Sequence, residues 1–262
     1  MELKFYKYHG AGNDFIMIDN RERFFNPEAT TITKLCHRFF GIGADGLILL
    51  EHHPEADFRM RYFNSDGREA TMCGNGGRCC VAFARFLGLV KSDANFIAAD
   101  GRHVAVILSE YDTSVVVKLK MSDVVNIQKF DEGFFLDTGS PHLVRFIENV
   151  NDLDVNAEGR KIRTMSKWGT DGVNVNFVEL KSGDVHGRTY ERGVENETLS
   201  CGTGAIAMAL AVYSNGFMTD SPLLIHAPGG QLKVHFNAVD HYFSNIWLEG
   251  PAERVFEGKI QF

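Results

Sequence analysis

The chain has 262 residues, enough for one large domain or for two domains of about half that length. With 44% hydrophobic and 23% charged residues, its composition is that of a globular protein and excludes disordered and collagen-like chains. The net charge of −7, without any run of Lys or Arg, argues against a nucleic-acid partner. The chain starts directly in strand-like alternation and lacks a membrane-length apolar run, so we expect no signal peptide and no membrane association.

Cysteine usage separates two kinds of thiol. The count is five, which is odd, and with no secretory signal it indicates the reducing cytoplasm rather than a disulfide framework. Cys36, Cys79 and Cys80 lie among apolar neighbours, and we expect them in the core. Cys73 and Cys201 instead precede glycines at helix starts. No Cys-x-x-Cys occurs and the ten histidines lack the i, i+4 spacing of a helical metal site, so we expect no metal site.

Periodicity predicts mixed helices and strands in each half. In the first half we expect a helix over 31–40, with Ile32, Leu35 and Phe39 on one face, and a second helix over 74–87. Strands are expected within 3–20 (two), 46–51, 58–63, 95–98, 103–108 and 114–120. In the second half the expected helices are within 156–165 and over 202–215. The expected strands are 133–136, 143–147, 172–180, 186–191, 223–226, 232–236, 242–248 and 254–262.

Four short motifs recur at nearly one offset. Gly12-Asn13 precedes Gly139-Ser140 by 127 residues, and Asp45-Gly46 precedes Asp171-Gly172 by 126. Arg61 precedes Arg188 by 127, and Cys73-Gly74 precedes Cys201-Gly202 by 128. A period close to half the chain indicates a duplicated domain rather than a solenoid.

The segment 202–217 contains no charged residue, so a helix there has to be buried on every side. We therefore expect an α+β fold with two pseudo-symmetric domains, each a curled, mostly antiparallel sheet or barrel around a central helix. The expected domains are residues 1–121, to which the strand 252–262 returns, and residues 122–251. Pseudo-symmetry would bring both helix starts, with Cys73 and Cys201, to one cleft.

The two glycine-rich helix starts have a chemistry of their own. Unpaired N–H groups at a helix N-terminus bind anions and favour a thiolate, and the glycines suggest close approach to a bound molecule. Neither loop continues as a nucleotide-binding motif. Two thiols facing one carbon indicate stereochemical inversion, in which one removes a proton and the other delivers one. The alternatives are a pair of buried thiols without function, a thiol redox protein, and a non-enzymatic binding module.

Several polar residues at turns or strand ends complement the thiols. Taken singly, Asn13, Asn64, Asn174, Glu191 and Arg192 are typical of turns or surfaces. Together they supply donors for a carboxylate, a carboxylate for an ammonium group, and a guanidinium for a second carboxylate. His142, after Pro141, is either a turn residue or a base beside a thiol.

At these motifs the sequence resembles the diaminopimelate epimerase family. The matching stretches are His9–Phe15, 41–46, 63–67, 72–79, 172–177 and 190–204, which occur in this order and span nearly the whole chain. The resemblance implies a cofactor-independent enzyme that interconverts LL- and meso-2,6-diaminopimelate for lysine and peptidoglycan synthesis, usually as a homodimer. A racemase of the same fold that acts on proline, hydroxyproline or histidine remains the nearest alternative.

The resemblance also implies roles for individual residues. Cys73 and Cys201 would be the acid and base, assisted by His142 and Glu191. The substrate would be held by Asn13, Asn64, Asn174, Glu191 and Arg192, with Gly74, Asn75, Gly202 and Thr203 around the reacting carboxylate. Two positions depart from the family pattern: Ser140 stands where an asparagine is usual, and Gly46 where some members have glutamine. Both departures concern the distal end of the substrate.

Overall fold

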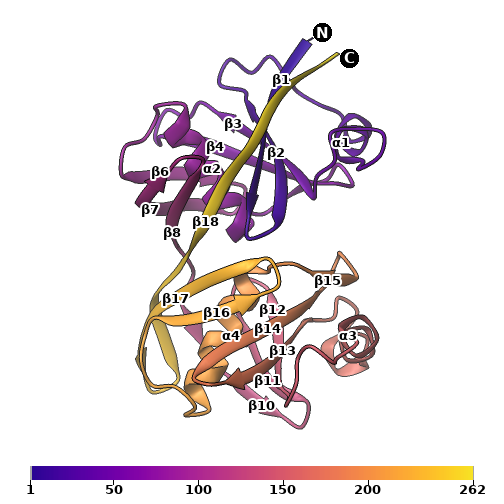
Figure 1. Ribbon diagram of the computed structural model, residues 1–262, viewed down its shortest axis with the longest axis vertical. Helices are drawn as coiled ribbons and strands as arrows, with labels where there is room; N and C mark the ends of the chain where they lie inside the picture. The colour runs from indigo at the N-terminus through magenta and orange to yellow at the C-terminus, as the bar shows by residue number, and fades with distance from the viewer. Residues whose placement is uncertain (1, 262) are drawn as a thin grey trace. The chain divides into compact units, whose positions relative to one another are not determined.

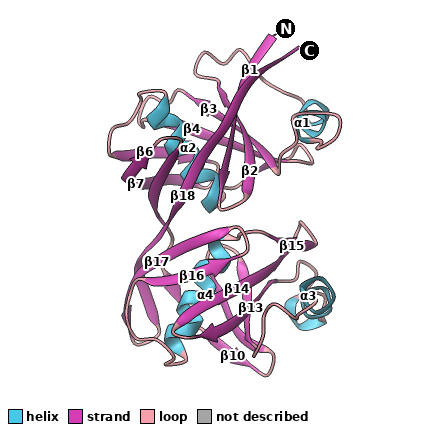
Figure 2. Ribbon diagram, in the orientation of Figure 1, coloured by secondary structure: helices cyan, strands magenta, loops and turns pink. Residues whose placement is uncertain are grey.

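The computed structural model describes residues 2–261, which group into two compact units. Among these residues, unit 1 comprises 2–119 with 250–261, and unit 2 comprises Lys120–Glu249. Each unit is a curled, mostly antiparallel sheet with one helix inside it and one outside, as the sequence predicts (Figures 1 and 2). No helix within residues 2–261 has the length and apolar character needed to cross a bilayer.

Unit 1 is a closed sheet. Its elements are β1 (Glu2–Gly10), β2 (Asn13–Asp19), α1 (Ala29–Cys36), β3 (Gly46–Glu51), β4 (Phe58–Asn64), β5 (Glu69–Ala70), α2 (Gly74–Phe86), β6 (Asp93–Ala98), β7 (Gly101–Tyr111), β8 (Ser114–Lys120) and the end of β18 (Tyr242–Gln261). The ladders run β18–β1–β2–β3–β4–β6–β7–β8 and return to β18. Only β2–β3 and β4–β6 are parallel pairs in this ring.

Unit 2 repeats this order of pairs. Its elements are β9 (Val124–Val125), β10 (Gln128–Phe130), β11 (Gly133–Asp137), β12 (Pro141–Phe146), α3 (Val155–Arg163), the 3₁₀ helix η1 (Ser166–Trp168), β13 (Asn174–Lys181), β14 (Asp184–Glu191), β15 (Asn196–Thr198), α4 (Gly202–Ser214), β16 (Leu223–Ala227), β17 (Gly230–Val239) and the start of β18. The parallel pairs β12–β13 and β14–β16 correspond to β2–β3 and β4–β6 of unit 1. The predicted duplication is therefore present in the strand pairing.

The central helices are enclosed by their own sheets. α2 contacts β1, β2, β3, β4 and β7, and α4 contacts strands β11 to β14, β16 and β17. Residues 205–212 of α4 are each at most 2% exposed. Burial on all sides is thus the reason that this helix carries no charged residue.

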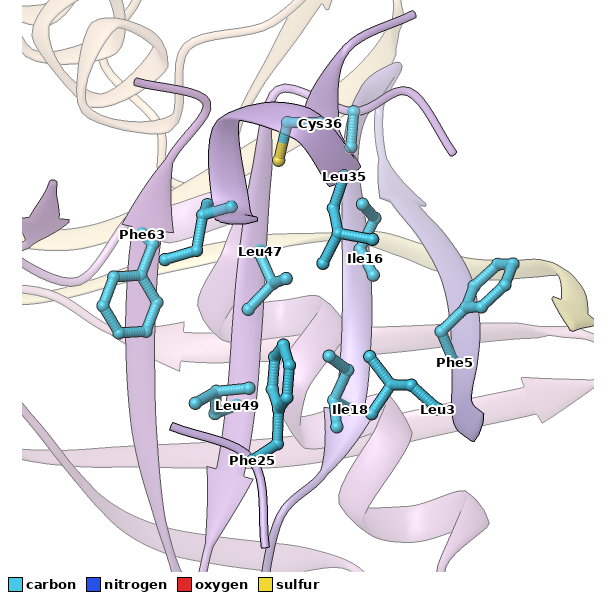
Figure 3. Packing of buried hydrophobic residues seen from close by; sticks show 12 residues of the cluster. Leu3, Phe5, Ile16, Ile18, Phe25, Leu35, Cys36, Leu47, Leu49 and Phe63 are labelled. Carbon is cyan, nitrogen blue, oxygen red and sulfur yellow. The ribbon is translucent and has the colours of Figure 1, made fainter. Parts of the chain in front are cut away.

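The other helix of each unit covers the outer face of its sheet. In unit 1, Ile32, Leu35 and Cys36 of α1 pack on Ile16 and Leu47, with the remaining cluster residues shown in Figure 3. In unit 2, α3 contacts β13, β14 and β15 and contributes Val155 and Ile162 to a second cluster. Strands covered on both faces have no polar face, which explains the continuous apolar runs of β2 and β3.

Two element predictions are wrong in their extent. The first helix ends at Cys36 rather than at residue 40, and Phe39 is 88% exposed instead of packed. The chain folds back so closely that a Cβ on Gly41 would lie 2.0 Å from the carbonyl oxygen of Lys34, and Ile42 packs on the cluster in place of Phe39. At the other end, the two strands expected over 242–248 and 254–262 are one strand, β18.

Candidate functional site

In unit 1 the Cys73 thiol lies at the start of the central helix. Cys73 is the N-cap of α2 and is partly exposed. Its Sγ donates to Oδ1 of Asn13 at 3.6 Å, and Nδ2 of Asn75 donates to the same oxygen at 3.3 Å. The Asn13 amide therefore joins the thiol, the first turn of α2 and the start of β2.

Asn13 is held in place by a charged network behind it. Its Nδ2 donates to Oδ2 of Asp45 at 2.7 Å, and the backbone N–H of Asp45 donates to Oδ1 of Asp14 at 3.0 Å. Arg38 bridges Asp14 and Asp45 at 2.9 and 2.7 Å, and Lys7 pairs with Asp14 at 2.6 Å. Burial alone would raise the pKa of Asp14, but hydrogen bonds from Arg38 and Lys7 outweigh it and lower that pKa to about 2.

A fully buried guanidinium lies behind the Cys73 loop. Arg78, on α2, is 0% exposed and donates to Oδ1 of Asn75 at 2.7 Å and to the carbonyl oxygen of Gly74 at 3.3 Å. Burial lowers the pKa of Arg78 to about 10, while attraction to Cys73 in its thiolate form acts in the opposite direction. Because such attraction is mutual, the charge of Arg78 favours the thiolate form of Cys73.

Asn64 lies at the same edge of the sheet as Asn13. The β2–β3 ladder starts with Phe15 opposite Gly46, and Gly46 is in turn opposite Asn64 at the end of β4. Asn64 is exposed, and its Oδ1 accepts from the Tyr62 hydroxyl at 2.7 Å. A Cβ on Gly46 would lie 2.6 Å from Cε2 of Tyr62, so the tyrosine ring occupies the space that a larger residue at position 46 would need.

In unit 2 the Cys201 thiol occupies the corresponding N-cap of α4. Its Sγ lies 3.5 Å from Oγ1 of Thr203, which lies 3.0 Å from Nε2 of His142. The other ring nitrogen, Nδ1, is 3.0 Å from Nδ2 of Asn176. An amide nitrogen can only donate, so Nδ1 accepts, the ring proton is on Nε2, and it is donated to Thr203. The hydroxyl proton of Thr203 is then free for Cys201.

His142 is neutral in this chain of hydrogen bonds. It is 0% exposed, and burial lowers its pKa to about 3. The imidazole therefore acts on Cys201 as a fixed donor through Thr203, and it does not itself gain a proton near neutral pH.

Asn174, Glu191 and Arg192 lie at the ends of β13 and β14, the edge equivalent to that of Asn13 and Asn64. Nδ2 of Asn174 donates to Oγ of Ser140 at 2.8 Å, and its Oδ1 accepts from the backbone N–H of Arg192 at 2.9 Å. Oε1 of Glu191 accepts from the Thr198 hydroxyl at 2.6 Å. Arg192 also lines a cavity of about 370 Å³ within unit 2.

The structure thus brings the predicted site residues into two groups, one in each unit. Group 1 contains Asn13, Asn64, Cys73, Gly74 and Asn75, and group 2 contains His142, Asn174, Glu191, Arg192, Cys201, Gly202 and Thr203. The sequence analysis missed the residues that support them, chiefly Arg78, Asp45, Asn176 and Thr198. A charged residue directly before the apolar residues Cys79–Ala84 of α2 was the available signal for Arg78.

Part of the glycine pattern has a packing explanation. A Cβ on Gly76 would lie 3.1 Å from Cδ1 of Ile48, and one on Gly204 would lie 2.6 Å from Oδ1 of Asn176. These two glycines let the helices approach their sheets, so they are not by themselves a sign of a bound molecule.

The remaining thiols are in the core, as predicted. Cys36, Cys79 and Cys80 are each at most 3% exposed. Burial raises the pKa of all three, to about 12 for Cys36. They are therefore poor nucleophiles and poor bases at neutral pH.

Comparisons with known proteins give one consistent result. A family model described as "Diaminopimelate epimerase" matches residues 5–126 and 134–255. The chain is 52% identical over 260 residues to the diaminopimelate epimerase of Flavobacterium psychrophilum, covering 98% of this chain and 100% of the relative. It is 43% identical to that of Chlorobaculum tepidum, covering 96% and 98%. A Bacillus anthracis protein of the PhzF family of phenazine biosynthesis proteins shares the fold, with a TM-score of 0.80, 15% identity and 100% coverage of both chains.

Proposed function

Because the chain belongs to the diaminopimelate epimerase family, we propose that it interconverts LL- and meso-2,6-diaminopimelate with two thiols and no cofactor. The observation that carries this proposal is the repeated half-site: each unit places one partly exposed cysteine at the N-cap of a buried helix. A reaction that removes a proton from one face of a carbon and adds one to the other needs two such groups.

The proton transfer is balanced by the two thiols alone. The thiolate of one cysteine takes the α-proton, so that an S–H bond forms and the electron pair of the C–H bond stays on the carbon. The thiol of the other cysteine then delivers its proton to the opposite face and becomes a thiolate. The enzyme ends the turnover with the two protonation states exchanged, which is the form that accepts the opposite stereoisomer.

The helix starts supply stabilisation where charge develops. The N–H groups of the Gly74-Asn75 and Gly202-Thr203 turns belong to the first turns of α2 and α4. We assign them to the α-carboxylate, which gains negative charge as the proton leaves. In group 2 the neutral His142 supports Thr203, and the Thr203 hydroxyl donates to Cys201 when it is a thiolate.

We assign the distal amino-acid end of the substrate to the strand-end residues. Arg192 supplies a guanidinium for the second carboxylate, and Glu191 supplies a carboxylate for the second ammonium group. Asn64 and Asn174 supply side-chain amides for hydrogen bonds to the same end of the substrate. Asn174 is already oriented by Ser140 and by the backbone of Arg192. A substrate with a single amino-acid head, such as proline or histidine, would leave this set unused.

Solvent deuterium distinguishes this proposal from its alternatives. Incubation in D₂O with LL-diaminopimelate should give meso product that carries deuterium at the inverted carbon, while the substrate recovered early stays unlabelled. That pattern follows because different groups remove and deliver the proton. Exchange into proline, hydroxyproline or histidine, with none into diaminopimelate, would reject the substrate assignment.

The two cysteines can be tested separately. Cys73→Ala and Cys201→Ala should each lower kcat for epimerisation by at least about 10³-fold, because each removes one of two required proton carriers. Cys36→Ala, which removes a buried thiol, serves as the control and should retain activity. A single Cys73 or Cys201 variant with near wild-type turnover would contradict the two-thiol assignment.

We further propose that the enzyme acts in the cytoplasm as a homodimer. The five free cysteines suit a reducing compartment, and the family resemblance implies the dimer. Light scattering after size exclusion should give twice the 29.3 kDa mass of the chain. If the protein is a monomer at nanomolar concentration and remains fully active there, the proposed homodimer is rejected.

A further inference from the structure

A second cluster of ionisable side chains lies in unit 2, at the far end of β14 from Glu191. β14 and β16 run parallel with His186 directly opposite His226, and Asp184 lies two residues before His186, on the same face of β14. One potential ligand atom from each of these three residues lies within 4.8 Å of the others. Asp184 and Glu191 are the first and last residues of β14, so the cluster is about 17–23 Å from Glu191 along the strand.

Within this cluster, His226 has an unsatisfied nitrogen. Its Nε2 is shielded from solvent and has no hydrogen-bond partner among the described residues. Oδ1 of Asp184 lies 3.8 Å away, beyond hydrogen-bonding distance. The two imidazole rings are stacked, with centroids 4.7 Å apart and planes 17° apart. A buried ring nitrogen without a partner calls for a physical explanation, and a bound cation supplies one.

The opposite nitrogen of His226 lies beside an amide side chain. Nδ1 is 3.3 Å from Nε2 of Gln231 on β17, and an amide nitrogen can only donate. A metal ion on Nε2 of His226 therefore requires the Gln231 amide to turn over, so that its oxygen accepts the Nδ1 proton and the lone pair is left on Nε2. A hydrogen bond of this kind fixes the tautomer and the ring orientation of histidine ligands.

We propose that Asp184, His186 and His226 form a binding site for a divalent transition metal ion of the zinc type. Two imidazole nitrogens and one carboxylate are suited to Zn²⁺ or Co²⁺ rather than to Mg²⁺ or Ca²⁺, which prefer oxygen ligands. Tetrahedral binding at about 2.0–2.1 Å sets ligand atoms about 3.3 Å apart. The side chains therefore have to converge from their present spacing, with the rings turning out of their stacked arrangement.

The site joins two strands that share only a short ladder. The β14–β16 ladder consists of two pairs, Val185–Ile225 and His186–His226. A metal ion held by both strands would stabilise this junction in the folded state, by an amount that grows with the free metal concentration. The sequence analysis looked for histidines at the i, i+4 spacing of a helix. It missed this site because the two histidines lie on separate strands.

The test uses Zn²⁺ and Co²⁺ with the full chain. Zn²⁺ also binds thiolates, so binding is measured by calorimetry both for the wild type and for a Cys73→Ser/Cys201→Ser variant. The double variant should bind one equivalent of Zn²⁺ with micromolar or tighter affinity and melt at a higher temperature with the metal. Co²⁺ should give visible bands of nitrogen and oxygen ligation without a sulfur charge-transfer band.

Variants in the same background assign the ligands. His226→Asn and Asp184→Asn should each weaken Zn²⁺ binding by at least 10-fold and abolish the thermal shift, and Asp184, which is half exposed, can be replaced with little effect on folding. His235→Asn is the matched control, because His235 is a partly exposed histidine that pairs with Glu249 elsewhere in unit 2. No Zn²⁺ binding at 100 µM by the double variant, or unchanged binding by His226→Asn, would overturn the proposal.

Discussion

At the scale of single residues, the two proposed catalytic cysteines have different surroundings. Cys73 has a buried cation behind its loop, because Arg78 supports Asn75 and Gly74. Cys201 has a neutral hydrogen-bonded chain through Thr203 to His142. The matched positions of the thiols are evident from the sequence motif, whereas these different supports arise from residues outside it.

Replacing Arg78 tests whether its charge acts on Cys73. In Arg78→Met, alkylation of Cys73 by iodoacetamide should require a higher pH, and kcat/KM should fall about 10-fold or more, because the thiolate loses a nearby cation. Arg78→Lys keeps the positive charge, so it should bring the pH dependence of Cys73 alkylation most of the way back to that of the wild type. Alkylation of Cys201, read from its own peptide by mass spectrometry, is the internal control. If the pH dependence of Cys73 alkylation is unchanged in Arg78→Met, the charge of Arg78 does not act on the thiol and the residue contributes only packing.

His142 should make the protein sensitive to acid. Its pKa of about 3 in the folded state is below the ordinary value of 6.5, so between these values the unfolded chain binds the extra proton. The neutral ring therefore makes its full contribution to the free energy of unfolding above pH 6.5. This contribution is lost as the pH falls toward 3, and the free energy of unfolding falls by up to about 1.4 kcal/mol per pH unit.

Urea unfolding at pH 4–7 measures this contribution. His142→Gln should show a shallower fall in unfolding free energy with acidity than the wild type, while the exposed His241→Gln should match the wild type. Equal slopes for His142→Gln and the wild type would mean that His142 is already protonated or accessible in the folded protein.

At the scale of elements, the sequence predicts what burial dictates. The absence of charge in 202–217 required a central helix, and the structure encloses α4 accordingly. Apolar–polar alternation and continuous apolar runs in the sequence predicted the positions of most strands. Short elements such as β5 and β15 carry too few residues for a periodic signal, and they depend on pairing with β4 and β14.

The limits of the elements were less predictable, because tertiary contacts set them. The sequence analysis expected two strands, over 242–248 and 254–262, yet Pro251 between them belongs to β18 and pairs with Val116 of β8. Phe39 fitted the helical period but is excluded, because Ile42 packs on the cluster instead. Local spacing cannot decide between two apolar residues that compete for one site in the core.

Gly204 tests how tightly α4 must approach its sheet. In Gly204→Ala the new Cβ would lie 2.6 Å from Oδ1 of Asn176, the residue whose amide orients His142. We expect a loss of about 1–3 kcal/mol in unfolding free energy and a fall in kcat of at least 10-fold. Ser214→Ala, at the exposed end of the same helix, should change neither quantity. Wild-type turnover in Gly204→Ala would show that the Asn176–His142 contact is dispensable.

At the scale of the whole molecule, one strand belongs to both units. β18 pairs with β17 and β9 in unit 2 and with β8 and β1 in unit 1. Figure 1 shows its second half beside β1. Without this half, the edges of β1 and β8 would both be unpaired, so the ring of unit 1 would be open.

Ending the chain after Glu249 should therefore affect the two units differently. We expect rapid hydrogen exchange in β1, β8 and α2, because the core of unit 1 is opened, while α4 and β13 of unit 2 keep their protection. Mass spectrometry of peptic fragments measures both in one sample. Protection lost equally in both units would show that they fold only together.

The different supports of Cys73 and Cys201 also have a kinetic consequence. A catalyst leaves the equilibrium between two stereoisomers unchanged, so the ratio of kcat/KM in the two directions is fixed by the solution chemistry alone. A buried cation behind one thiol and a neutral donor chain behind the other can change both kcat/KM values only by a common factor, but they can change separately how each direction divides between kcat and KM. Duplication followed by divergence of the two halves thus gives each stereoisomer its own saturation behaviour, although both share one overall balance.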